Sequence, residues 1–239
     1  MCGIVGFTGK ADAAPILLDG LERLEYRGYD SAGIAIGRED EIEVVKSMGR
    51  LAVLREKCEN GAAVPGCVGI GHTRWATHGR PSDVNSHPHV SENGRIAIVH
   101  NGIIENYLSL KEMLIRRGRV FTSETDTEVA AQLIDFYYEG NILEAVAKAA
   151  HELEGSYALG VICADTPGTL VAVKSHAPLI VAYGAEKWNL SIPGVEIITP
   201  RRYITDPRYA STPGTRVLNL SRSYRYQSNG YYVSLLAAA

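Results

Sequence analysis

Cysteine occupies position 2, between the initiator Met1 and a short apolar run at 3–7. Aminopeptidases generally remove methionine when a small residue follows, so we expect the mature chain to begin with Cys2. An α-amine titrates near ~8 and a thiol near ~8.5, so at neutral pH the amine can take the thiol proton. One residue then supplies both nucleophile and base, the logic of N-terminal threonine nucleophiles. The alternative is a cysteine buried at the start of a first strand.

A polar segment, His72-Thr-Arg-Trp-Ala-Thr-His-Gly79, follows an apolar stretch that we predict to be a strand. Arg74 can grip a carboxylate with two parallel hydrogen bonds, which lysine does less well. Thr77 and His78 can hold the same group from the other side. The alternative is a loop stabilised by its own hydrogen bonds. The two histidines of 86–89 flank a proline without a clear third ligand, so we expect no metal site.

Two further segments offer groups that bind substrate. Asn101 and Gly102 follow a predicted strand; an amide donor beside an unobstructed backbone N–H suits an oxyanion hole, although Asn-Gly is also a common turn pair. In Ser123-Glu-Thr-Asp-Thr-Glu128, Asp126 can receive a substrate ammonium. The alternative there is a well-capped helix start. The segment 26–33 is either part of a site or a tight turn with an Asp cap.

The elements that must position these groups are short strands and a few helices. Apolar runs predict strands at 4–7, 33–36, 42–45, 68–71, 96–99, 157–163, 170–173 and 179–182. Helical spacing, capping residues and stop glycines predict helices near 15–24, 107–117, 125–139 and 142–153. Strands and helices do not alternate regularly, which argues against a doubly wound parallel sheet. We therefore expect an α+β sandwich, with sheets layered between helices.

Composition excludes several classes of function. The 239 residues carry a formal net charge of −3, which argues against nucleic acid or an acidic membrane as the main partner. The four cysteines show no paired spacing typical of zinc or of a disulfide framework. No apolar run approaches ~18 residues, and no basic region precedes an apolar leader. We expect a cytoplasmic enzyme with reduced thiols and no cofactor.

Taken in order, these motifs resemble those of class II glutamine amidotransferases, which use an N-terminal nucleophile. Within that family the chain is most similar to the glutaminase domain of isomerising glutamine–fructose-6-phosphate aminotransferases. The resemblance rests on six segments between residue 2 and about residue 182: Cys2-Gly-Ile-Val-Gly, Leu24-Glu-Tyr-Arg-Gly-Tyr-Asp-Ser-Ala-Gly, His72-Thr-Arg-Trp-Ala-Thr-His-Gly, His87-Pro-His, His100-Asn-Gly-Ile-Ile-Glu-Asn and Ser123-Glu-Thr-Asp-Thr-Glu.

The resemblance implies a four-layer αββα fold of the N-terminal nucleophile hydrolase type. It also implies that Cys2 attacks the side-chain amide of L-glutamine through a thioester intermediate, releasing glutamate and ammonia. Asn101 and the Gly102 N–H would hold the oxyanion, Arg74 the α-carboxylate and Asp126 the α-ammonium. Further residues would complete the pocket or its mobile cover: Trp75, Thr77 and His78.

The resemblance also limits what this chain can do alone. In the family, ammonia reaches a sugar-phosphate acceptor in isomerase domains that these residues lack, and homodimers rest largely on those domains. We expect an amidotransferase domain at 1–183 and an atypical tail at 184–239. The tail resembles a domain that precedes RimK-like ATP-grasp ligases, so it is either a fragment of a second domain or divergent closing strands. The rival functions are amidotransfer to another acceptor, such as an ATP-grasp ligase partner, and a catalytically silent binding domain.

Overall fold

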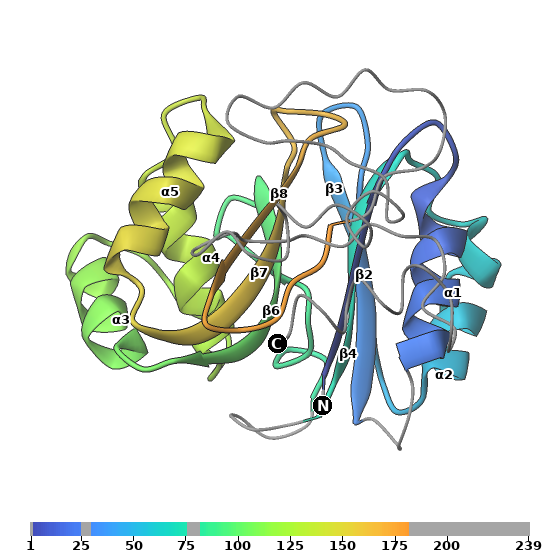
Figure 1. The fold of residues 1–239 in the computed structure, drawn as a ribbon, viewed down its shortest axis with the longest axis horizontal. Coiled ribbons are helices and arrows are strands. Elements are labelled where there is room, and N and C mark those ends of the chain that lie inside the picture. The colour runs from blue at the N-terminus through green and yellow to red at the C-terminus, as the bar shows by residue number, and fades with distance from the viewer. Residues whose placement is uncertain (1, 25–29, 76–81, 182–239) are drawn as a thin grey trace, which may run out of the picture. The chain divides into compact units, whose positions relative to one another are not determined.

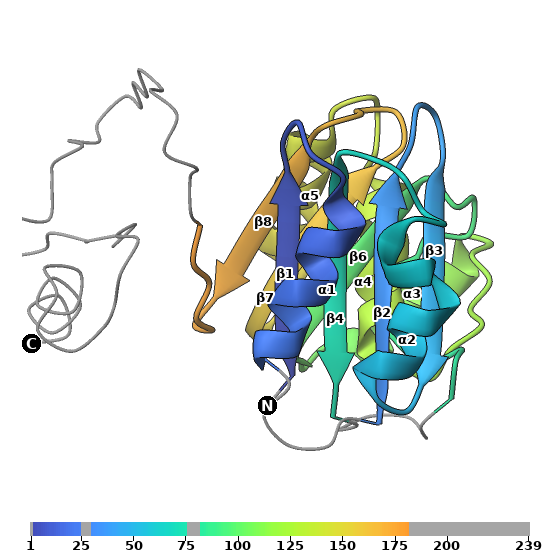
Figure 2. The ribbon, with the colours of Figure 1, turned by 90° about the vertical axis from the view of Figure 1, so that its right-hand side faces the viewer.

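The computed structural model describes residues 2–24, 30–75 and 82–181. Two four-stranded antiparallel sheets lie face to face, and helices cover their outer faces (Figures 1 and 2). The first sheet has the order β1-β4-β2-β3 and the second the order β5-β6-β7-β8. The four-layer αββα sandwich predicted from the sequence is thereby confirmed. The compact unit formed by this part of the chain ends at Leu179.

The strands of the first sheet are β1 (Gly3–Thr8), β2 (Ser31–Gly37), β3 (Ile42–Met48) and β4 (Val68–Arg74). Those of the second are β5 (His89–Val90), β6 (Ile96–Ile104), β7 (Gly155–Cys163) and β8 (Leu170–Ser175). Two helices cover the first sheet, α1 (Ala13–Leu24) and α2 (Leu51–Lys57), and a 3₁₀ turn follows at Glu59–Gly61. Three helices cover the second: α3 (Tyr107–Arg116), α4 (Asp126–Phe136) and α5 (Ile142–Glu152).

Three apolar layers hold the sandwich together. Alternation along β2 sends Ile34 and Ile36 towards α1 and sends Ala35 into the layer between the sheets. Along β6, Ile98 faces the helices and Val99 faces the first sheet. Because both faces of each sheet are covered, the central strands read as nearly continuous apolar runs, which is why the sequence reveals them.

The sequence predicts most of these elements correctly, but it places one strand wrongly and misses two short elements. The strand expected at 179–182 is wrong for 179–181, which are irregular; Ala182 lies outside the described residues. Ile180 is 70% exposed, so its apolar side chain gains no burial from strand pairing there. The sequence analysis missed α2, which buries only Leu51 and Leu54 along its seven residues, and the two-residue strand β5. Both are too short to show a clear period.

None of the helices within the described ranges is long and apolar enough to cross a membrane.

Candidate active site

Cys2 lies at one end of the first sheet, where β1 pairs with the end of β4. The antiparallel register sets Gly3 opposite Thr73, and the Gly3 N–H donates to the Thr73 hydroxyl over 3.2 Å. The Trp75 N–H donates to the Cys2 Sγ over 3.2 Å, and the Trp75 carbonyl lies 3.5 Å from the same sulfur. Cys2 is half-buried. The thiol is thus held by backbone groups yet open to a small molecule, which is what a nucleophile requires.

Asn101 reaches Cys2 from the second sheet. Its Nδ2 donates to the Cys2 carbonyl over 3.0 Å, and its Oδ1 lies 3.0 Å from the Nε2 of His72 on β4. The Nδ2 group carries two hydrogens, so one remains to meet an oxyanion beside the thiol. The expected pairing of Cys2 with an amide donor is therefore present in the geometry, although 99 positions separate the two residues.

Asn101 and Gly102 lie within the last part of a strand rather than beyond it, and the alternative of a turn is wrong. The strand β6 continues to Ile104, with Asn101 opposite Ala158 and Gly102 opposite Tyr157 of β7. Gly102 has a φ of +118°, and a Cβ there would lie 2.0 Å from the Ser156 carbonyl. Glycine is therefore required by the close approach of β7, and its backbone is exposed beside the Asn101 amide.

Arg74 is the last residue of β4, and only 3% of its surface is exposed. Its Nη1 lies 3.9 Å from the Asp30 Oδ1, and the Asp30 N–H donates to the Arg74 carbonyl over 3.1 Å. The Ser31 hydroxyl donates to the same Asp30 oxygen over 3.0 Å. A buried guanidinium at a strand end is suited to a carboxylate, because arginine carries five donors in a planar fork.

Asp126 is the first residue of α4, and its Oδ2 accepts the Ile104 N–H over 3.0 Å. It is 6% exposed, and its Oδ1 lies 3.8 Å from the His100 Nδ1. Thr125 caps the helix by accepting the Glu128 N–H. Glu128 reaches back to accept hydrogen bonds from the backbone and hydroxyl groups of Thr122 and Ser123. The capping interpretation is therefore confirmed, and the separate hydrogen bond from Ile104 ties Asp126 to β6, two residues beyond Gly102.

The sequence analysis missed a cluster of buried histidines behind Asn101. The His72 and His87 ring centroids lie 4.1 Å apart, and those of His87 and His89 lie 5.0 Å apart. Thr127 links the cluster to α4, because its hydroxyl lies 2.8 Å from the His87 Nε2 and 2.9 Å from the His100 Nδ1. These residues come from segments 72, 87–89 and 100, so only the fold reveals that they meet. Among the described residues, no group of three or more His, Cys, Asp or Glu side chains is arranged to hold a metal ion.

Burial keeps three of these histidines neutral. Desolvation lowers the pKa of His72 to about 3, although its hydrogen bond to Asn101 acts in the opposite direction. Desolvation likewise holds the pKa of His87 and of His89 well below the usual value, and the neighbouring cations and imidazoles add to the effect. Each ring therefore carries one proton at neutral pH, and its two nitrogens have different roles.

The structure brings Cys2, Trp75, Asn101 and Gly102 together directly. Arg74 adjoins this group along β4, and Asp126 adjoins it through Ile104. Thr77 and His78 lie outside the described residues, as do 26–29 of the predicted Tyr-Arg-Gly-Tyr-Asp segment. The roles of all these side chains towards a substrate stay predictions.

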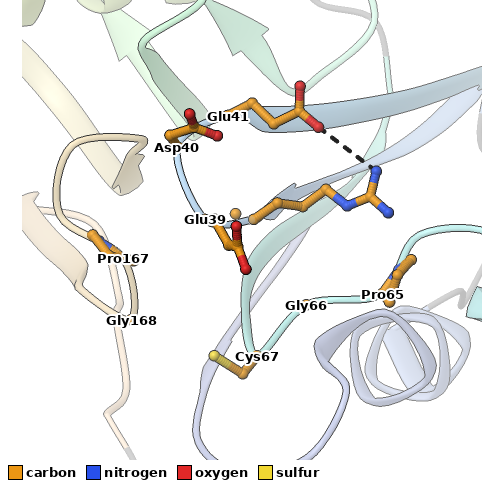
Figure 3. Close-up of a pocket in the computed structure, with 10 residues that line it drawn as sticks. Glu39, Asp40, Glu41, Pro65, Gly66, Cys67, Pro167 and Gly168 are labelled. Atoms are coloured by element: carbon orange, nitrogen blue, oxygen red, sulfur yellow. Dashed lines mark ion pairs between the residues drawn. The ribbon is translucent and has the colours of Figure 1, made fainter.

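A hollow of about 570 Å³ lies at the opposite end of β1 and β4, away from Cys2 (Figure 3). Its lining includes the acidic turn Glu39, Asp40 and Glu41, together with Cys67 and Gly168. The dashed line in Figure 3 joins Arg38 to Glu41, a 3.7 Å contact between exposed side chains. The space is larger than a small amino acid needs, but its lining contains no donor that faces the Cys67 sulfur in the way Trp75 faces Cys2. We therefore place the candidate site at Cys2.

A two-sheet sandwich with a cysteine at position 2 beside an asparagine amide is the arrangement of an amidotransferase that uses an N-terminal nucleophile. The family model of the glutamine amidotransferase domain matches residues 33–177 of the sequence, and the chain belongs to this family. A second model, that of the RimK-like ATP-grasp N-terminal domain, matches residues 200–239, which lie outside the described part.

The chain is 58% identical over 208 residues to the isomerizing glutamine–fructose-6-phosphate aminotransferase of Caldanaerobacter subterraneus subsp. tengcongensis, covering 86% of this chain and 34% of that protein. It is 57% identical over 197 residues to the same enzyme of Clostridium tetani, covering 82% and 32% respectively. The chain thus spans about a third of the length of these relatives.

Among solved structures, the glutamine phosphoribosylpyrophosphate amidotransferase of B. subtilis, complexed with ADP and GMP, is similar with a TM-score of 0.60 and 29% identity. The match covers 69% of this chain and 35% of that one. The fold is therefore the α+β sandwich of N-terminal nucleophile amidotransferases.

Proposed function

We propose that this chain hydrolyses the side-chain amide of L-glutamine and that Cys2, exposed by removal of Met1, is the nucleophile. The observation that carries the proposal is the placement of the Cys2 sulfur: the Trp75 N–H lies 3.2 Å from it, and the Asn101 amide contacts the carbonyl of the same cysteine. A nucleophile beside a fixed amide donor is the minimum that acyl transfer requires.

The reaction begins when the α-amine of Cys2 takes the thiol proton and the sulfur attacks the carboxamide carbon. The oxygen becomes an oxyanion, which the Asn101 Nδ2 and the Gly102 N–H stabilise. The C–N bond then breaks, the amine returns its proton to the leaving nitrogen, and ammonia departs from a thioester. Water attacks the thioester while the amine accepts its proton, the C–S bond breaks, and that proton returns to the sulfur. The balance is glutamine plus water to glutamate plus ammonia.

Two buried charges select glutamine over a simple amide. Arg74, buried at the end of β4, binds the α-carboxylate, and Asp126, buried at the start of α4, binds the α-ammonium. Trp75 is 50% exposed beside the thiol, and we assign to it, to Thr77 and to His78 the role of covering the bound glutamine. Charge-assisted hydrogen bonds at both ends of a zwitterion contribute about 1.5–3 kcal/mol each.

The acceptor of the ammonia is the second part of the proposal. The relatives are named for transfer to fructose 6-phosphate, so we favour this acceptor, reached in domains beyond the amidotransferase domain at 1–183. The match of 200–239 to a RimK-like ATP-grasp N-terminal domain favours a second candidate, an ATP-grasp ligase partner as acceptor, with 184–239 as part of that second domain. The cytoplasmic location and the homodimer of the full-length protein stay predictions.

Glutamate release by the purified chain tests the proposal, with intact mass showing whether Met1 is absent. We expect the wild type to form glutamate and Cys2→Ala to form none. Cys67→Ser is the matched control, because Cys67 is also exposed but lies at the opposite end of the first sheet. It should retain full activity. Equal turnover by wild type and Cys2→Ala, or full activity with Met1 attached, would contradict the proposal, and equal inactivity would favour a silent binding domain.

A further inference from the structure

We propose that His72 is a positioning residue, which fixes the Asn101 side chain with its NH₂ group towards Cys2 and its oxygen turned away. The inference rests on the proposed function and adds to it a requirement for a second residue. Asn101 supplies the amide donor, and His72 determines which end of that amide the reacting carbon meets.

The need for such a residue follows from the shape of a carboxamide. The Oδ1 and Nδ2 ends of Asn101 are nearly equal in size, so rotation by 180° about the last side-chain bond exchanges them at little steric cost. In the flipped state Oδ1 would face the Cys2 carbonyl and any oxyanion, and two acceptors would oppose each other. The observed state has Nδ2 at 3.0 Å from the Cys2 carbonyl and Oδ1 at 3.0 Å from the His72 Nε2.

His72 can hold this state because its tautomer is determined. Its side chain is buried, with 1% of the residue exposed, so the ring is neutral and carries one proton. The His72 Nδ1 is buried and has no hydrogen-bond partner among the described residues, so a proton on it would be an unsatisfied donor. The ring therefore keeps its proton on Nε2, where Asn101 Oδ1 accepts it. A flipped amide would present its own N–H to this N–H, or would force the ring proton onto Nδ1; in either case a buried donor is left unsatisfied. Such an unsatisfied donor costs about 1–3 kcal/mol, enough to keep Asn101 in one orientation.

The ring of His72 is itself held from behind. It stacks on His87 with a tilt of 45°, and His87 is bonded to Thr127 on α4. Gly33 admits this segment, because a Cβ there would lie 2.2 Å from the His87 carbonyl. The Thr127 hydroxyl has one hydrogen and two imidazole neighbours, so it donates to at most one of them and accepts from the other. The path from Asn101 thus ends at α4, beside Asp126.

A merely structural role for a buried histidine is the competing explanation, and a double-mutant cycle separates the two. We expect His72→Leu, which removes the donor without leaving a large cavity, to lower kcat for glutamine hydrolysis by about 10- to 100-fold, below the cost of losing an oxyanion donor outright. The KM for glutamine should change by less than about threefold, since Arg74 and Asp126 are untouched. In an Asn101→Ala background the same change should lower kcat by less than about twofold.

Two variants and one chemical probe complete the design. His72→Gln keeps an N–H donor at the reach of Nε2, and we expect it to restore most of the kcat lost in His72→Leu. His89→Leu is the matched control, because His89 is equally buried but contacts Thr125 rather than Asn101. The fold-change in kcat caused by His89→Leu should be the same in the wild-type and the Asn101→Ala backgrounds. Alkylation of Cys2 by iodoacetamide, followed by peptide mass, should proceed at the wild-type rate in His72→Leu, because it forms no oxyanion.

The positioning role would be overturned if the losses of kcat multiplied in the His72→Leu, Asn101→Ala double variant, or if His72→Gln were as slow as His72→Leu. Neither result would contradict the proposed hydrolysis of glutamine. An active Cys2→Ala enzyme would instead overturn the proposed function. If His72→Leu does not fold, His72→Asn replaces it, because the shorter amide of that variant does not reach Asn101. The double-mutant cycle is then repeated with His72→Asn, and its kcat is compared with that of His72→Gln.

Discussion

The two ends of the first sheet each carry a reachable cysteine, and they differ in everything around it. At one end, Cys2 meets backbone groups of Trp75, which directly follows β4, and the amide of Asn101 on β6. At the other end, Cys67 is exposed at the rim of a hollow of about 570 Å³ beside an acidic turn. Space and a thiol are present at the second end. Among the described residues, hydrogen-bond donors that the two sheets hold beside a thiol are found only at the Cys2 end.

The comparison teaches where the constraint lies. At the Cys2 end, buried polar groups bond to specific partners, so each one limits the next: His72 limits Asn101, and Ile104 holds Asp126. The Nδ1 atoms of His72 and His87 are the described exceptions, because they have no hydrogen-bond partner there. Buried polar networks of this kind specify one arrangement, because a half-satisfied network is costly. At the Cys67 end, exposed charges are screened by water and contribute little. Substitutions should therefore be severe at one end and mild at the other.

The largest contrast should come from two glycines, both with positive φ. Gly102→Ala places a Cβ 2.0 Å from the Ser156 backbone carbonyl, which no side-chain movement relieves, so β6 and β7 must separate locally. Gly168→Ala, at the hollow, has a φ of +78° and nothing within 4 Å of the new Cβ. We expect the first to abolish activity and lower the free energy of unfolding by more than about 3 kcal/mol, and the second to cost about 1–2 kcal/mol.

Urea unfolding and glutamate release measure both variants. Similar losses of stability in the two would mean that backbone strain alone, and not the approach of β7, explains the requirement for glycine at position 102.

Two aspartates give the next contrast. Asp126→Asn keeps an oxygen for the Ile104 N–H but removes the charge, so we expect kcat/KM for glutamine to fall by about 10- to 150-fold, mostly through KM. Asp40→Asn, in the acidic turn at the hollow, should leave both constants unchanged within about twofold. Steady-state kinetics with glutamine decides this. An unchanged KM in Asp126→Asn would remove Asp126 from the ammonium site and leave it as a tether between α4 and β6.

Local sequence patterns predicted most strands and helices of the molecule. The features that these patterns did not predict depend on contacts between residues distant in sequence. The run at 96–99 and the caps of α4 signal their elements because burial and capping act on neighbouring residues. The Asn101-Gly102 pair has the propensity of a turn, but pairing with β7 overrides it. Residues 179–181 have strand propensity and gain no burial.

The candidate site divides in the same way. Cys2 and Asn101 could be predicted from residue type and resemblance, because their chemistry is visible in the motif. His72, His87, His89 and His100 could not be predicted as a group, because they come from separate segments and β5 is too short to show in the pattern. A buried imidazole and a surface imidazole look the same in a sequence.

The smallest expected effect per residue is the change in the free energy of unfolding with pH that these buried histidines cause. His72, with a pKa lowered to about 3, His87 and His89 are neutral when folded, whereas in the unfolded chain they protonate near 6.5. Above pH 6.5 neither state binds the proton, and their contribution to stability is complete. Below it the unfolded state binds more protons, so the free energy of unfolding falls by up to about 1.4 kcal/mol per pH unit for each histidine.

Urea unfolding at pH 7.5, 6.5 and 5.5 measures this loss in a window above the range where carboxylates titrate, and His89→Gln should remove about one histidine's share of the slope. The cations that face the cluster, Arg74 and Lys46, oppose its protonation and deepen the effect. If stability stays flat from pH 7.5 to 5.5, the folded protein accepts these protons. The Cys2 end would then be hydrated like the Cys67 end, and a fixed tautomer at His72 could not hold Asn101.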